Sequence, residues 1–152
     1  MRLWRISNHA DLSGEGGRIV DGRWHSRGWP IVYLAEHPAL ALLEHLVDLE
    51  IDLADLPDNY QLIEVEVPDA LGIEEIAPES LDAGNRDWRR DPGFTQRLGS
   101  DWLRRRRSPL LSVPSVILPR STNFLLNPSH PDATRAAVAS ATRPPYDPRL
   151  FG

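Results

Sequence analysis

The sequence contains no cysteine and no lysine, and these two absences exclude several kinds of chemistry. Without cysteine the chain has no thiol nucleophile, no thiolate metal ligand and no disulfide. Without lysine it has neither a Schiff-base amine nor the lysine of a Walker phosphate-binding motif. All 17 basic residues are therefore arginines, so an anionic ligand must be held by guanidinium groups, backbone amides or helix ends.

The chain also lacks a long apolar run. No segment approaches the ~18 consecutive apolar residues of a membrane span, and residues 1–8 contain no apolar core of a secretory signal. We therefore expect a cytoplasmic protein that does not enter a membrane. The length of 152 residues, with 41% hydrophobic and 26% charged residues, predicts one compact domain over residues 1–152.

Charge and histidine spacing exclude two further classes of site. The net charge of −5 argues against a broad electrostatic attraction to nucleic acid, and we expect no direct nucleic-acid binding. The local exception, Arg104–Arg107, follows a predicted helix, where cations stabilise the exposed carbonyl groups. The histidines show no HExxH or other paired-ligand spacing, so the sequence predicts no metal site.

Strand patterns are spread along the whole chain. Alternating apolar residues and β-branched runs are typical of strands, and proline interrupts them. These patterns predict strands over residues 3–6, 30–35, 60–67, 110–118 (one or two strands broken by Pro114) and 123–127.

Helical patterns lie between these strands, without the regular alternation of a parallel sheet. The sequence therefore predicts an α+β fold. We expect a helix over 38–50, a second over 96–107 with Thr95 as its cap, and a short third helix over 133–141. The segment 68–93 should be irregular apart from one helical turn near 78–81, and the segment 144–148 should be extended.

The helix expected after Pro38 carries the most informative residue, Glu44. Leu40, Leu43, Val47 and Ile51 share one face at helical spacing, and Glu44 projects close to the same direction. A carboxylate beside an apolar stripe needs hydrogen-bond donors, a cation or water. Glu44 is thus either a functional group or an edge glutamate whose carboxylate reaches solvent.

A second group of candidates surrounds a glycine-rich segment. Five of the ten glycines fall within residues 14–28, which predicts a loop that can approach a ligand closely. Arg23, between Gly22 and Trp24, could hold an anion or form a salt bridge with Glu44 or an aspartate. Tyr33 is typical of a core residue whose hydroxyl finds a partner.

Several of these motifs, in this order, resemble the RES-domain toxins of bacterial Xre–RES type II toxin–antitoxin pairs. The resemblance covers nearly the whole chain, and the arginine, glutamate and serine of the family name match Arg23, Glu44 and Ser115. The motifs that carry it are Trp4-Arg5-Ile6, Gly22-Arg23-Trp24-His25 followed by Gly28, Pro30, Val32 and Tyr33, then Ala41-Leu42-Leu43-Glu44, Val113-Pro114-Ser115 and Asn127-Pro128-Ser129-His130.

The resemblance implies a fold similar to that of ADP-ribosyltransferases such as diphtheria toxin, and an activity that consumes NAD+ as substrate without a prosthetic group. It also implies an Xre-like helix-turn-helix antitoxin as partner. The implied catalytic residues are Glu44, Arg23, Ser115 and Tyr33, and the implied NAD+-binding residues are Arg23, Tyr33, Gly22, His25 and Ser115.

Three functions stay open at this point. The first is cleavage of the nicotinamide–ribose bond by a glycohydrolase or phosphorylase that depletes cellular NAD+. The second is transfer of ADP-ribose to a host protein, and the third is non-catalytic binding of a nucleotide or partner. Five tryptophans are more than a core of this size needs, so one or two could serve an interface, such as that of a homodimer within a larger toxin–antitoxin complex.

Overall fold

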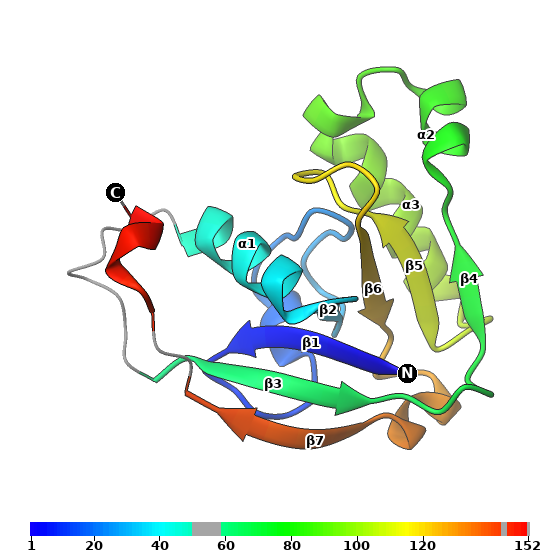
Figure 1. Ribbon diagram of the computed structural model, residues 1–152. Coiled ribbons are helices and arrows are strands. Elements are labelled where there is room, and N and C mark those ends of the chain that lie inside the picture. The colour runs from blue at the N-terminus through cyan, green and yellow to red at the C-terminus, as the bar shows by residue number, and fades with distance from the viewer. Residues whose placement is uncertain (50–58, 144–145, 152) are drawn as a thin grey trace.

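The computed structural model describes residues 1–49, 59–143 and 146–151. Within this part of the chain the strands form one seven-stranded sheet in the order β4-β5-β6-β2-β1-β3-β7 (Figure 1). Neighbouring strands are antiparallel, except that β4 is parallel to β5. The strands are β1 (Arg2–Ser7), β2 (Val32–Ala35), β3 (Gln61–Glu66), β4 (Ile73–Glu75), β5 (Leu110–Pro114), β6 (Thr122–Leu126) and β7 (Ala137–Thr142).

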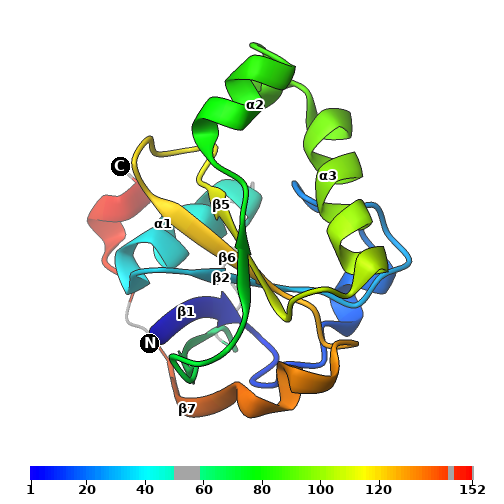
Figure 2. The ribbon, with the colours of Figure 1, turned by 90° about the vertical axis from the view of Figure 1, so that its right-hand side faces the viewer.

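Helices cover the sheet on two sides. Figure 2 shows α1 and α3 on opposite sides of β5 and β6. None of the helices in the described residues is long and apolar enough to cross a membrane. The α-helices are α1 (Pro38–Leu49), α2 (Pro78–Gly84) and α3 (Pro92–Arg105), and short 3-10 turns are η1 (Glu15–Arg18), η3 (Trp88–Arg90), η4 (Pro131–Arg135) and η5 (Pro148–Phe151).

The sheet opens between β1 and β2, and this opening positions the site described below. β1 pairs with β3 along its whole length, whereas β2 pairs with β6 over four residues. Among the described residues, β1 and β2 are paired only where Trp4 lies opposite Ala35. In Figure 1, β1, β3 and β7 consequently run across the view while β5 and β6 run steeply to them.

Two apolar clusters hold the two sides together. One includes Leu3, Ile63 and Val65 of β1 and β3, all at most 1% exposed. The other packs Trp24 and Trp88 with residues of α3 and β5. Full burial of an aliphatic side chain contributes about 1.5–3 kcal/mol, so both clusters anchor the backbone around the opening.

The strand predictions at β1, β2, β3, β5 and β6 are confirmed, as are the helix beginning at Pro38 and the α+β class. The alternation in β3 is confirmed as well, since Ile63 and Val65 are fully buried. The apolar face expected on α1 is wrong at Val47, which is 50% exposed, whereas Leu40 is 5% exposed. Ile51 and the expected helix end at Glu50 lie outside the described residues.

The prediction of Thr95 as the cap of a helix over 96–107 is wrong. The α3 helix begins at Pro92 and its cap is Asp91, whose carboxylate accepts a hydrogen bond from the Phe94 amide. Proline suits this first position because its missing N–H needs no partner there. Thr95 lies inside the helix, and its hydroxyl donates to the carbonyl of Arg23 at 2.6 Å.

Three further predictions are wrong in part. Residues 137–141 of the expected helix form most of β7, because pairing with β3 outweighs the helix preference of their alanines. The helical turn expected near 78–81 is confirmed as the first part of α2, but the rest of the segment 68–93 is not irregular throughout, because it also contains β4 and η3. Of the expected extended segment, Pro148 begins η5, and residues 144 and 145 lie outside the described residues.

Candidate active site

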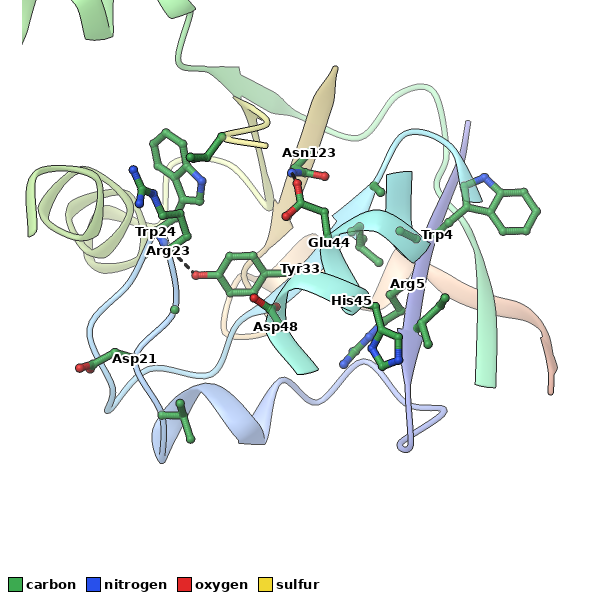
Figure 3. Close-up of a pocket in the computed structure, with 17 residues that line it drawn as sticks. Trp4, Arg5, Asp21, Arg23, Trp24, Tyr33, Glu44, His45, Asp48 and Asn123 are labelled. Carbon is green, nitrogen blue, oxygen red and sulfur yellow. Dashed lines mark hydrogen bonds between the residues drawn. The ribbon is translucent and has the colours of Figure 1, made fainter. Parts of the chain in front are cut away.

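A cleft of about 570 Å³ lies at the opening between β1 and β2 (Figure 3). The helix α1 and the strands β1, β2 and β6 form one wall, and the glycine-rich segment before β2 forms the other. Its lining combines aromatic rings with carboxylate, guanidinium and amide groups. The lining residues are Trp4, Arg5, Ile6, Val20, Asp21, Gly22, Arg23, Trp24, Tyr33, Leu34, Ala35, Ala41, Glu44, His45, Asp48, Val116 and Asn123.

Glu44 points from α1 into this cleft, where two side chains hold its carboxylate (Figure 3). The Ser115 hydroxyl donates to Glu44 Oε1 at 2.8 Å, and the Asn123 amide donates to the same oxygen at 2.7 Å. Hydrogen bonds to a charged acceptor are about twice as strong as neutral ones. The carboxylate is therefore fixed in direction at the wall of the cleft.

The Ser115 hydroxyl can donate to Glu44 because its acceptor side is already occupied. Ser115 follows the end of β5 and is 1% exposed. Its Oγ accepts from the amides of Ile117 and Leu118, each at 3.2 Å. A hydroxyl has one proton to give, and these two contacts direct that proton toward the carboxylate. Ser115 thus lies beneath the cleft rather than on its lining.

Tyr33 projects from β2 and forms a chain of hydrogen bonds with the opposite wall. Its hydroxyl accepts from the Trp24 amide at 3.0 Å and lies 2.7 Å from His25 Nδ1. His25 Nε2 in turn lies 3.0 Å from the carbonyl of Gly17. These partners assign a neutral imidazole that carries its proton on Nε2.

Burial shifts the pKa values of this pair in opposite directions, and both shifts favour the neutral forms. It raises the pKa of the Tyr33 phenol well above its ordinary value. It lowers the pKa of His25 below 6.5, against smaller opposing contributions from hydrogen bonds to the backbone. Both groups are therefore uncharged at neutral pH, and the pair rigidly connects β2 to the glycine-rich segment.

Gly22 lies where these rings meet the backbone. A Cβ atom built at this position would clash with Tyr33 Oη and lie 2.6 Å from His25 Nδ1. The Gly22 amide also donates to the carbonyl of His25 at 3.0 Å. Only glycine leaves room for the hydroxyl and the imidazole, which explains why the segment carries glycine immediately before Arg23.

Arg23 is anchored at the rim of the cleft by backbone carbonyls. Its Nη2 donates to the carbonyls of Trp88 at 2.7 Å and Arg89 at 2.6 Å. Among the described residues its buried Nε has no hydrogen-bond partner. Burial lowers the pKa of the guanidinium, and Asp91 partly opposes this. The salt bridge with Glu44 considered from the sequence is wrong in this structure, because Arg23 uses carbonyl groups instead.

The lining also includes three polar residues for which the sequence predicted no role at the site. Arg5 of β1 brings a second guanidinium, whose pKa burial lowers and Asp11 partly restores. His45 follows Glu44 on α1, and burial lowers its pKa below 6.5. Asn123 of β6 was part of a predicted strand, but no spacing linked it to Glu44. Only the pairing of β6 with β2 and β5 reveals that proximity.

Of the residues expected at the site, Gly22, Arg23, Tyr33 and Glu44 line the cleft. Ser115 and His25, which are 1% and 2% exposed, lie behind it and contact Glu44 and Tyr33 respectively. Within residues 1–49, 59–143 and 146–151, no group of three histidine or carboxylate side chains is placed to bind a metal ion.

The fold matches a known structure over almost its entire length. It superposes on a chain of the crystal structure of the M. tuberculosis MbcT–MbcA toxin–antitoxin complex with a TM-score of 0.74. The match covers 99% of this chain and 86% of that chain, at 19% sequence identity. With helices on two sides of one seven-stranded sheet, the molecule has the α+β fold that the sequence predicted, and it shares this fold with that chain.

The chain belongs to the RES-domain family, since residues 2–147 match the family model described as "RES domain". It is 45% identical over 151 residues to "Toxin Res" of Pseudomonas putida, covering 99% of this chain and 100% of that protein. It is also 43% identical over 159 residues to the "Prs ADP-ribosylating toxin" of Sphingobium sp., covering 98% and 96% of the two chains. The resemblance noted from the sequence motifs is thereby confirmed.

Proposed function

We propose that this protein is a toxin that breaks the bond between nicotinamide and ribose in NAD+. The observation that carries the proposal is the Glu44 carboxylate, held by Ser115 and Asn123 on the wall of a cleft that two guanidinium groups also line. Membership of the RES-domain family and the toxin names of its relatives support it.

The chemistry needs few groups. As the glycosidic bond breaks, positive charge builds on the ribose, and a carboxylate fixed nearby stabilises this oxocarbenium-like state. Glu44 is the residue to do so, and its second oxygen could also hold a ribose hydroxyl. Nicotinamide leaves as a neutral molecule from a cationic one, so the departure requires no strong general acid.

The other lining residues suit the rest of the dinucleotide. Arg23 and Arg5 would bind the pyrophosphate, because a guanidinium matches two phosphate oxygens at once. The Tyr33 ring would stack on nicotinamide or adenine while its hydroxyl stays in the chain with His25. Gly22 would let the backbone approach the ligand. NAD+ is a substrate in this scheme, and no prosthetic group is involved.

The second product depends on the acceptor of ADP-ribose. Water or phosphate as acceptor would deplete cellular NAD+ by hydrolysis or phosphorolysis. A protein side chain as acceptor would make the chain an ADP-ribosyltransferase, and the 43% identity to a protein named as an ADP-ribosylating toxin favours this second candidate. Both reactions share the bond-breaking step at Glu44.

The same reasoning extends to partners. A match to a chain of a toxin–antitoxin complex supports an antitoxin that binds this protein. We expect that antitoxin to be Xre-like, with a helix-turn-helix that binds DNA while the toxin itself does not. A homodimer within the assembled complex remains part of this proposal, since the partly exposed Trp4 at the cleft could serve an interface.

The proposal is tested by incubating the purified protein with NAD+ and measuring free nicotinamide. Labelled NAD+ in buffer, in phosphate and with a cell lysate then separates ADP-ribose, ADP-ribose 1-phosphate and a labelled protein band as products. Addition of the antitoxin encoded next to the toxin should suppress all three. Calorimetric binding of NAD+ without nicotinamide release would instead indicate a non-catalytic nucleotide-binding protein and contradict the proposal.

A further inference from the structure

We propose that Asn123 is a positioning residue, which holds Glu44 in the orientation that the reaction requires. The inference rests on the proposed function, because it concerns the same carboxylate. It gives a residue of β6 a role at the site, although none of the sequence motifs included that residue. Figure 3 shows the Asn123 amide directly beside the Glu44 carboxylate in the cleft.

The two donors to Glu44 use one oxygen and leave the other to face a ligand. Among the described residues, the side chains that donate to this carboxylate are Ser115 and Asn123, and both bind Oε1. A carboxylate bound on one oxygen from two directions cannot rotate about its terminal bond without breaking both contacts. Oε2 is therefore the oxygen available to the ribose.

Asn123 is suited to this role by its place in the sheet. It lies on β6 opposite Val113 of β5 on one side and Ala35 of β2 on the other. Its backbone is thus held by neighbours on both edges, and its side chain reaches the cleft from a rigid strand. Glu44, by contrast, stands on α1, points into the cleft and is only partly buried. A rigid donor fixes the rotamer of a flexible acid.

The two donors have different consequences if they are lost. Ser115 is also bound by two backbone amides, so its removal disturbs the turn after β5 as well as Glu44. The Asn123 side chain makes its one hydrogen bond to Glu44 within the described residues. Replacement of Asn123 therefore releases Glu44 with the least change elsewhere.

The chain offers a matched control in Asn127, one residue beyond β6. Its amide is 2% exposed and donates to the carbonyl of Leu103 at 3.1 Å, away from the cleft. Asn123→Ala removes the hydrogen bond to Glu44, whereas Asn127→Ala removes the one to Leu103 and one that the Asn127 side-chain oxygen accepts from the Ser129 amide. Only replacement of Asn123 should alter catalysis beyond what a loss of stability explains.

The experiment measures kcat and KM for nicotinamide release in the wild type, Asn123→Ala, Asn123→Asp and Asn127→Ala. A reacting group displaced by about 1 Å can lose about 100-fold in rate, so we expect Asn123→Ala to lose about 10- to 100-fold in kcat, with KM nearly unchanged. Asn123→Asp keeps the shape but cannot donate, and should lose at least as much. Asn127→Ala should melt at a lower temperature with an unchanged kcat.

A kcat for Asn123→Ala within about twofold of the wild type would overturn the inference. If that variant does not fold, the same criterion applies to Asn123→Asp. A double-mutant cycle of Asn123→Ala and Glu44→Ala separates this inference from the proposed function. Non-additive shifts in melting temperature are expected even if the wild type releases no nicotinamide, and in that case additive shifts would overturn the inference.

Discussion

The two walls of the cleft hold their functional side chains in different ways. On the wall built from α1, β1, β2 and β6, Glu44 is held by side chains, namely the hydroxyl of Ser115 and the amide of Asn123. On the wall built from the glycine-rich segment, side chains bind backbone. Arg23 donates to two carbonyls, and the Trp24 amide of this wall donates to the hydroxyl of Tyr33, which reaches across from β2.

This difference suggests a separate task for each wall, charge stabilisation for one and substrate binding for the other. A carboxylate held by two neutral donors keeps its charge directed into the cleft, as stabilisation of a developing cation requires. Guanidinium and phenol groups held by backbone provide a shaped and rigid surface against which a dinucleotide can lie. Damage to the first wall should therefore lower the rate, and damage to the second should lower stability or substrate binding.

Gly22→Ala should have the largest effect on the second wall. The new Cβ would clash with Tyr33 Oη, so the hydroxyl and the His25 ring must move. Overpacking of this kind costs about 1–3 kcal/mol in the free energy of unfolding, which denaturant titration measures. Gly16→Ala is the matched control, because no atom lies within 4 Å of its built Cβ. Equal stability of both variants would contradict the close packing described for Gly22.

Arg23→Lys should have the next largest effect. Lysine keeps the positive charge but loses the planar fork that reaches two carbonyls and a phosphate together. We expect KM for NAD+ to rise about tenfold, which corresponds to about 1.4 kcal/mol, while kcat changes little. A KM equal to that of the wild type would remove Arg23 from pyrophosphate binding.

The smallest effect concerns the pH dependence of stability. Burial lowers the pKa of His25 in the folded protein, while the unfolded chain titrates near 6.5. As pH falls below about 6.5, the unfolded chain therefore binds more protons than the folded one, and the free energy of unfolding decreases. An NMR titration of the His25 ring should give a pKa below 6.5. A value above 6.5 would contradict the neutral chain from Tyr33 to Gly17.

The sequence predicted the elements whose signals are local. Pro38 and the apolar spacing after it marked the start of α1, and the alternation around Ile63 and Val65 marked β3. It missed β7, because alanines favour a helix in isolation and nothing in the sequence of this segment indicates that it pairs with β3. It also misplaced the start of α3, because Thr95 is a common type of cap residue, whereas the carboxylate of Asp91 accepts the capping bond in the structure.

The candidate site shows the same division. Glu44 could be singled out because a carboxylate beside an apolar stripe needs a partner, and motif order pointed to Ser115. Asn123 could not, since 79 residues separate it from Glu44 and only the order of the strands brings them together. The anchoring of Arg23 on the carbonyls of Trp88 and Arg89 was equally hidden, because backbone acceptors carry no sequence signal.

The most direct test of the account compares nicotinamide release by the wild type and Glu44→Gln, with NAD+ binding to each measured by calorimetry. Glutamine keeps the size of the side chain and removes the charge, and loss of one charge-stabilising group at a reacting centre costs about 10²- to 10³-fold in kcat. We therefore expect Glu44→Gln to bind NAD+ with nearly unchanged affinity and to release nicotinamide about 100-fold more slowly or slower still. Release at the rate of the wild type would show that the carboxylate on α1 does not perform the reaction.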